Sequence, residues 1–309
     1  MKMEMGYSMI FHPLLTITPT SKKPILRNLG IKGSNKIVST IFPWLNTRSV
    51  SILFFCLYSN FITLFAAPKI EINGDNWGDV RNDGIEEVLL TAVDLILPYS
   101  NQENWPTIRI ENSVAGPMVL HQRGEKGEYT IFLNTNDRRW CQYVFQFAHE
   151  LGHILCNYQK DSSSIRWLEE SICEVASLFV LGQMEEAWKG TSLHKQDPLY
   201  AAEFTRYFQA RINMVEKIPN EEFKFWWEQL LPSLETNAIH RRSNLIIAKK
   251  LLPLFQQSPE VAWKACRTLN QNQARSHSSF KETIHAWSEA SKDPLHKSFV
   301  LSLEKVFLP

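Results

Sequence analysis

The spacing of apolar residues changes along the chain, from alternation in its earlier part to helical periodicity later. Alternating apolar and polar residues are typical of strands, and they occur in 69–73, 107–111, 118–122 and 128–134. The last two segments flank the turn-rich stretch 123–127 and therefore predict a hairpin. One helix is expected among these strands, because 85–97 has apolar residues three and four positions apart and Pro98 follows it.

Beyond these strands every clear pattern is helical. The two longest helices are predicted over 138–157, after the start signals Asn136 and Asp137, and over 165–181. Further helices are predicted over 199–214, 221–231, 244–256, 259–269, 280–290 and 295–307.

Composition agrees with a globular protein of this kind. The chain has 309 residues, of which 44% are hydrophobic and 12% aromatic, enough for a sizeable core. Lys and Arg number 33 and Asp and Glu number 32, so nothing in the charge indicates a nucleic-acid partner. The predicted fold class is α+β: residues 68–309 form the domain, with a small α/β part (68–157) and a mainly helical part (158–309).

Two segments precede this domain. Residues 1–48 carry seven Lys or Arg against one acid, Glu4, which predicts a disordered basic tail. Residues 49–67 are uncharged and have about the length that crosses a bilayer, roughly 20 residues. We expect a signal peptide cut near Ala66 or Ala67, or an uncleaved anchor that associates with a membrane, with a buried core helix as the alternative. The positive charge before this run predicts that the domain is exported, either secreted, periplasmic or anchored outside the cytoplasm.

The segment 147–155 contains the pattern His-Glu-x-x-His on a predicted helix. Residues four apart lie on one helix face, so His149 and His153 can offer two imidazole nitrogens to one ion. Zinc accepts such ligands, and a catalytic zinc site adds a third protein ligand and a water. Glu150 stands where a carboxylate can take the proton of that water. The alternative is a helix with two unrelated histidines.

A third ligand is available on the next predicted helix, in the sequence Trp167-Leu168-Glu169-Glu170. We expect Glu170 to be this ligand, with Glu174 and then Glu169 as substitutes. Glu174 falls one turn after Glu170 on the same face, and we expect its carboxylate to support a metal-binding histidine through the second ring nitrogen. Glu169 is expected on a solvated helix face.

These residues resemble the gluzincin group of zinc metallopeptidases, and Trp-Leu-Glu-Glu is similar to the Trp-Leu-x-Glu of the M1 aminopeptidase-like families. The resemblance covers 142–179 and implies a zincin-like fold, a bound Zn2+ and peptide or protein substrates. The connection from His153 to Glu170 is shorter than is usual in that group. Ala115-Gly116-Pro117-Met118 only echoes the aminopeptidase Gly-x-Met-Glu-Asn signature, so exopeptidase specificity does not carry over. The resemblance also implies a strand that borders the cleft and pairs with the substrate, for which 129–134 is the candidate, with an ordinary core strand as the alternative.

In related enzymes a tyrosine or histidine from the helical part stabilises the oxyanion that hydrolysis generates. Tyr207 is the first candidate for this catalytic role, and an ordinary structural role is the alternative for every candidate. The other candidates are Tyr200, His194 and His240.

Four cysteines lie outside the apolar run: Cys141, Cys156, Cys173 and Cys266. Cys156 follows His153 by three residues and Cys173 follows Glu170 by three, so an exported protein could join them by a disulfide. Free buried thiols are the alternative. We do not expect thiolate ligands, because a cysteine-rich closed site would be structural rather than catalytic.

The sequence therefore predicts a zinc-dependent peptidase in which His149, His153 and Glu170 hold the metal and Glu150 is the general base. One alternative is a non-catalytic, zinc-stabilised binding or assembly protein on the same fold. Another is a membrane-anchored structural protein in which the motif has no role. The oligomeric state is not indicated by any pattern in the sequence.

Overall fold

Four short strands form one mixed sheet in the order β1-β2-β4-β3 in the computed structural model, which describes residues 67–100, 102, 104–159, 165–271 and 279–308. The strands are β1 (Ile70–Ile72), β2 (Ile108–Asn112), β3 (Met118–Val119) and β4 (Tyr129–Leu133). β2 pairs in parallel with both β1 and β4, whereas β3 pairs antiparallel with β4, with Val119 opposite Ile131. The predicted hairpin is therefore confirmed, although β3 is shorter than the alternating segment.

The order of the strands corrects one prediction. The strand expected to border the cleft and pair with substrate was 129–134, but β4 is hydrogen-bonded to β2 on one side and to β3 on the other. A strand with two neighbours has no free backbone groups for a third. The sheet edge that lies against the helix of the His-Glu-x-x-His motif belongs to β3 instead.

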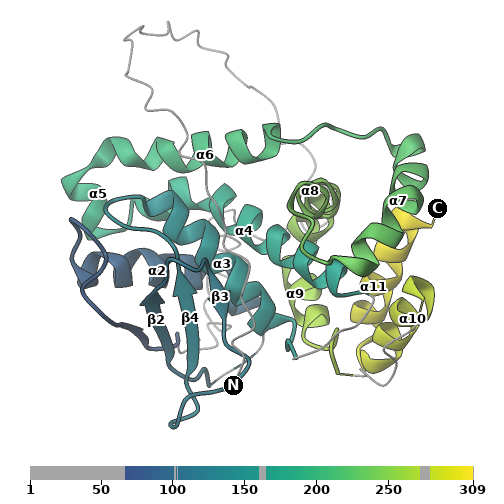
Figure 1. Ribbon diagram of the computed structural model, residues 1–309, viewed down its shortest axis with the longest axis horizontal. Helices are drawn as coiled ribbons and strands as arrows, with labels where there is room; N and C mark the ends of the chain where they lie inside the picture. The colour runs from purple at the N-terminus through teal and green to yellow at the C-terminus, as the bar shows by residue number, and fades with distance from the viewer. Residues whose placement is uncertain (1–66, 101, 103, 160–164, 272–278, 309) are drawn as a thin grey trace, which may run out of the picture. The chain divides into compact units, whose positions relative to one another are not determined.

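Two helices cover the sheet. Helix α2 (Asn82–Ile96) packs on β1, and α3 (Trp140–Leu155), which carries the motif, packs on β3 and β4 beside α2 (Figure 1). The expected start signal of α3 has another role. Asp137 has a left-handed backbone (φ 52°), and its carboxylate accepts a hydrogen bond from the Asp79 amide at 2.9 Å. Helix α3 itself has no side-chain cap and begins three residues later.

Helix α4 (Arg166–Trp188) is the central helix of the helical part, and α3, α6 and α8 pack around it (Figure 1). Of its 23 residues, 16 are buried, because neighbouring helices cover most of its surface, and exposed residues such as Glu186 lie toward its C-terminal end. The remaining elements are η2 (Leu97–Ser100), α5 (Ser192–Gln196), η3 (Pro198–Tyr200), α6 (Ala201–Asn213), α7 (Asn220–Thr236), α8 (Arg241–Gln257), α9 (Pro259–Cys266), α10 (Phe280–Ala290) and α11 (Pro294–Phe307). The α+β fold class, with a small sheet followed by a mainly helical part, is confirmed.

Aromatic side chains form much of the core between the later helices. Trp167 of α4 lies 5.6 Å, between ring centroids, from both Phe280 of α10 and Phe307 of α11, and 6.0 Å from Trp227 of α7. All four rings are buried. Buried aromatic side chains contribute more apolar area than other residues, so this cluster holds the C-terminal helices against the start of α4.

The predictions about the N-terminal segments concern residues that the structure, with the exception of Ala67, does not describe. The basic tail 1–48 and positions 49–66 of the predicted signal peptide or anchor lie outside the described residues. Within the described part of the chain, no helix combines the length and the apolar character needed to cross a membrane.

Candidate metal centre and active site

The two histidines of the motif lie on one face of α3 and point toward α4. Their ring centroids are 5.2 Å apart. The Nε2 atom of His149 lies 3.4 Å from Oε2 of Glu170, and Nε2 of His153 lies 3.9 Å from the same oxygen. The structure thus brings three predicted residues from two helices together around one point, with all three side chains at most 12% exposed.

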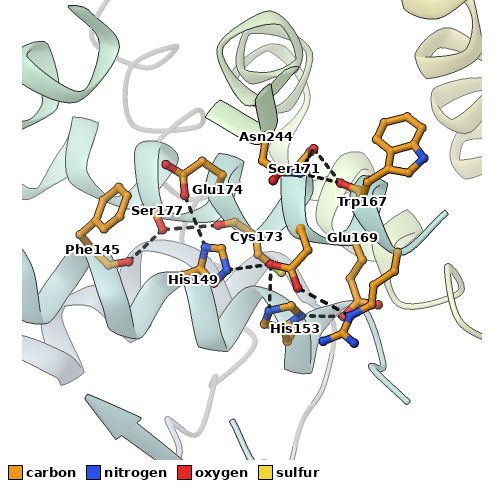
Figure 2. A network of polar contacts seen from close by, with 12 residues as sticks. Phe145, His149, His153, Trp167, Glu169, Ser171, Cys173, Glu174, Ser177 and Asn244 are labelled. Carbon is orange, nitrogen blue, oxygen red and sulfur yellow. Dashed lines mark hydrogen bonds and ion pairs between the residues drawn. The ribbon is translucent and has the colours of Figure 1, made fainter. Parts of the chain in front are cut away.

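The second nitrogen of each imidazole ring faces its own carboxylate (Figure 2). Nδ1 of His149 lies 3.5 Å from Oε2 of Glu174, and Nδ1 of His153 lies 2.6 Å from Oε1 of Glu169. The expectation that Glu169 faces solvent is wrong, because its side chain is only 12% exposed. Its position follows from the approach of α3 to α4, which sequence spacing alone does not give.

Both carboxylates are held in turn by residues that no sequence pattern indicated. Nδ2 of Asn270 donates to Oε2 of Glu169 at 2.7 Å and to the carbonyl of Cys156 at 3.0 Å. The guanidinium of Arg211 on α6 lies 3.3 Å from Oε1 of Glu174 and stacks over the ring of Phe145 at 4.2 Å. Asn270 and Arg211 are 101 and 37 residues from their partners, so only the tertiary structure reveals them.

The buried charges shift one another's pKa. Burial alone would lower the pKa of His149, but hydrogen bonds to Glu170 and Glu174 raise it to about 10. Burial likewise opposes the charged form of His153, but the charge of Glu170 and the contact with Glu169 raise its pKa to about 9. Burial raises the pKa of Glu170, but the two histidines have the larger effect and lower this pKa to about 2. The metal-free site is therefore a cluster of imidazolium and carboxylate ions.

Glu150 lies on the side of α3 that faces the sheet. Its side chain is buried, which raises the pKa of its carboxyl group, and the backbone N–H of Val119 in β3 is a hydrogen-bond partner that opposes this shift. The expected general base thus contacts the edge strand β3, next to the histidines on α3. A carboxylate with a raised pKa is suited to accept a proton near neutral pH.

A thiol also borders the site. Cys173, one turn after Glu170 on α4, has its Sγ within 4.8 Å of ring nitrogens of both His149 and His153. Cys156 is hydrogen-bonded to the thiols of Cys173 and Cys266. All four cysteines of the described residues are free, so the disulfide considered between Cys156 and Cys173 is not formed in the structure.

The four candidates for oxyanion stabilisation lie on or beside four different helices. Tyr207 on α6 packs edge-on against Phe145, one turn before His149, and burial raises the pKa of its hydroxyl to about 12. Tyr200 is occupied at the start of α3, where its hydroxyl accepts a hydrogen bond from the amide of Cys141 at 3.3 Å.

The two histidine candidates lie on other elements. Nδ1 of His240, the residue before α8, shares a hydrogen bond of 2.7 Å with the hydroxyl of Ser243 in the first turn of α8. His194 lies in the short helix α5, where its backbone amide donates to the Thr191 hydroxyl at 3.0 Å and its ring Nδ1 is buried without a hydrogen-bond partner among the described residues. Of the four candidates, Tyr207 is thus the one that packs directly beside the helix turn of the metal site.

A further tyrosine near the site was not expected. Asn157 has a left-handed backbone (φ 52°) and ends α3, with the amide of Tyr158 donating to the carbonyl of His153 at 3.1 Å. This is a Schellman turn, for which asparagine at the C′ position is the sequence signal. The turn directs Tyr158 back to the site, 6.4 Å from the His153 ring between centroids, where its hydroxyl donates to the carbonyl of Leu120.

The donors match what a metal ion requires. Two imidazole nitrogens and a carboxylate oxygen form the usual donor set of a catalytic zinc site. Ligands about 2.0–2.1 Å from a tetrahedral ion lie roughly 3.4 Å from one another, and His149 Nε2 and Glu170 Oε2 have this separation. Carboxylates behind both histidines are typical of metal-bound imidazoles.

In part of the chain, the fold and the site resemble those of zincin-like metallopeptidases. Residues 107–177 match the family model Peptidase_M78, described as the IrrE N-terminal-like domain. The matched range begins just before β2 and ends at Ser177 in α4, so it contains every residue proposed for the metal site. Searches of curated proteins and of solved structures found no significant match.

Proposed function

We propose that the protein is a zinc-dependent peptidase of the gluzincin type, which hydrolyses peptide bonds in peptides or proteins. His149, His153 and Glu170 are the proposed metal ligands, and Glu150 is the proposed general base. The observation that carries this proposal is the convergence of both Nε2 atoms on one oxygen of Glu170, at 3.4 and 3.9 Å.

Two side chains compete for the role of third ligand, and the protonation states favour Glu170 over Cys173. A metal binds the thiolate and the carboxylate rather than their protonated forms. Burial and the hydrogen bond with Cys156 raise the pKa of Cys173 well above its usual value. The two histidines instead keep Glu170 ionised, with a pKa of about 2. Glu170 is therefore ready to bind a cation at neutral pH, whereas burial opposes the thiolate form that Cys173 would need as a ligand.

The chemistry follows from the positions of these groups. When bound, zinc supplies Lewis acidity, which acidifies water and polarises a peptide carbonyl. Glu150 accepts the proton of the attacking water and then donates it to the leaving amine. Glu169 and Glu174 hold the imidazole rings so that the Nε2 atoms remain directed toward the ion. Tyr207 is the proposed donor to the oxyanion.

One observation favours a second candidate function, a non-catalytic zinc-stabilised binding protein. Cys173 lies beside both histidines, and a site that used Cys173 in addition to Glu170 would have four protein ligands. Four-coordinate closed sites stabilise structure and leave no position for water. The buried carboxyl of Glu150 favours the peptidase, because a structural site has no need for a base at this point.

The test compares the full chain with Glu150→Gln and with Glu186→Gln, a control on the exposed side of α4. Bound zinc is measured by elemental analysis, and cleavage is measured on a mixture of unfolded proteins. We expect all three proteins to bind one zinc and Glu150→Gln to lose about 100-fold or more in cleavage rate. If all three proteins bind zinc and none of them cleaves the mixture, the result would favour the non-catalytic binding protein. Absence of zinc in a folded wild type would exclude both functions.

A further inference from the structure

Three arginines interact electrostatically with Glu170 or Glu174, one each from α4, α6 and α8. Arg166 Nε lies 3.7 Å from Oε1 of Glu170, and Arg211 lies 3.3 Å from Oε1 of Glu174. Arg241, the first residue of α8, is the exception: within the described part of the chain its guanidinium has no hydrogen bond and no ion pair, and the residue is exposed. Two cations of the site are thus paired, and the third faces solvent.

The position of Arg241 is fixed by the packing of α8 on α4. Asn244, one turn further along α8, donates 3.2 Å hydrogen bonds to the carbonyl of Trp167 and to the hydroxyl of Ser171, the neighbour of Glu170 (Figure 2). Residues three apart lie on the same helix face, so Arg241 begins on the face of α8 that Asn244 directs toward α4.

Helix α8 is also tied to the end of α6. Nζ of Lys249 donates to the carbonyl of Ile212 at 2.9 Å and to that of Val215 at 3.3 Å. Helix α8 is therefore held against α4 through Asn244 and against the end of α6 through Lys249. These contacts place the backbone of Arg241 one turn from residues that touch the neighbours of Glu170.

Electrostatics agree with this placement. Partial burial lowers the pKa of Arg241, the charge of Glu174 raises it, and Arg211 and Glu170 also act on it. Glu174 is already paired with Arg211 and with His149, and Glu170 with Arg166, so the carboxylates near Arg241 have closer partners. The guanidinium nevertheless remains charged at any physiological pH.

We propose that Arg241 is a specificity-determining residue that binds a carboxylate of the peptide substrate on the α8 side of the metal site. This inference rests on the proposed peptidase function. A guanidinium presents a planar fork of donors that matches a carboxylate in a bidentate geometry, and a charge-assisted pair of this kind is strong where water is partly excluded. The carboxylate belongs either to an Asp or Glu side chain or to the C-terminus of the substrate.

The experiment uses a library of random decapeptides, prepared once with free C-terminal acids and once with C-terminal amides. The full-length wild type, Arg241→Gln, Arg241→Lys and Arg242→Gln are loaded with zinc, and the products are sequenced by mass spectrometry. Arg242 is the matched control, because it is the next residue of α8, is 61% exposed and pairs with Glu216. A second measurement, independent of cleavage, is retention of both libraries on immobilised Glu150→Gln with and without Arg241→Gln.

We expect wild type and Arg242→Gln to prefer carboxylate-bearing peptides, and Arg241→Gln to lose this preference by roughly 10- to 100-fold. Arg241→Lys keeps the charge without the fork and retains part of the preference. Asp or Glu enriched at one position in both libraries identifies a side chain as the source. Cleavage of the last residue in the free-acid library alone identifies the C-terminus.

Cleavage with no carboxylate preference, or a preference that survives Arg241→Gln, overturns the inference and leaves the peptidase function standing. Retention that depends on Arg241 without any cleavage supports carboxylate binding and removes the peptidase function. Neither retention nor cleavage of any peptide removes both.

Discussion

Gly152 lies so close to Cys173 that a side chain at position 152 would collide with the backbone of α4. A Cβ atom built on Gly152 would lie 2.9 Å from Cα of Cys173 and 3.2 Å from Cβ of Ala176. Gly152 directly precedes His153 on α3, and Cys173 is one turn from Glu170 on α4. The close approach of the two helices at this point is what brings the histidines within reach of the glutamate.

We expect Gly152→Ala to separate α3 from α4 and weaken the metal site. Overpacking of this kind costs about 1–3 kcal/mol, and the obstacle is backbone rather than the end of a flexible side chain. The measurements are the free energy of unfolding in urea without metal and the zinc affinity of the folded protein. Gly182→Ala on α4 is the control, because its Cβ would meet only Phe208 at an ordinary 3.7 Å. Equal effects of the two substitutions would contradict the prediction.

The pair formed by Glu169 and His153 gives a second prediction. Glu169→Gln removes the negative charge that holds Nδ1 of His153 at 2.6 Å, and Asn270→Ala removes the donor that holds Glu169 at 2.7 Å. Loss of such a partner typically weakens metal binding by about 10- to 100-fold. We expect Glu169→Gln to lie in this range and Asn270→Ala to have a smaller effect, as measured by competition with a chelator. Zinc affinity equal to that of Glu186→Gln in both variants would show that this pair does not act on the metal.

The identity of the third ligand can be read from cobalt substituted for zinc. We expect Glu170→Ala to lose metal binding by 100-fold or more and Cys173→Ala to retain it, because the histidines lower the pKa of Glu170 to about 2 while burial raises that of Cys173. Cobalt bound to a thiolate absorbs strongly through sulfur-to-metal charge transfer. The wild type should lack this absorption, and its presence in wild type but not in Cys173→Ala would assign Cys173 as a ligand.

The histidines give a pH dependence with a definite sign. The pKa values of His149 and His153 in the folded, metal-free protein, about 10 and about 9, exceed the usual value of 6.5. A raised folded-state pKa stabilises the folded state fully below pH 6.5, and this stabilisation is lost as the pH rises through 9 and 10. We therefore expect the free energy of unfolding of the metal-free protein to fall between pH 6.5 and 10.

Zinc binding should have the opposite pH dependence to the stability of the metal-free protein, because zinc binds the neutral imidazoles and releases their protons. The apparent zinc affinity should accordingly rise with pH over the same interval. Titration calorimetry at pH 7.5 in buffers of different ionisation enthalpy measures the released protons, and we expect about two. In Glu170→Gln the metal-free protein should show a smaller dependence, since one carboxylate that raises both pKa values is gone. A stability that is flat from pH 6.5 to 10 would contradict the assignment of charged histidines.

The sequence by itself determined the order and type of the elements. Periodicity located the strands and most of the helices, as for 280–290, where the predicted helix and α10 coincide. Helix α4, however, continues to Trp188 beyond the predicted end at 181, and the short helix α5 was not predicted. The pattern His-Glu-x-x-His placed His149 and His153 on one helix face in advance, because residues one turn apart on a helix share a face. These features depend only on the spacing of residues close together in the chain, so they can be predicted from the sequence.

Only the tertiary structure decided which strand lies at the edge of the sheet beside α3 and which side chains hold the imidazole rings. The alternation of 128–134 predicts a strand, but whether that strand is internal depends on pairing with segments distant in sequence. In the same way, Glu169 was expected to face solvent, and it lies against His153 because Gly152 lets α4 approach α3. Arg211 reaches the site from α6, and Asn270 reaches it from the turn after α9. Their positions result from helix packing over long separations, a relation that the spacing of residues along the chain does not encode.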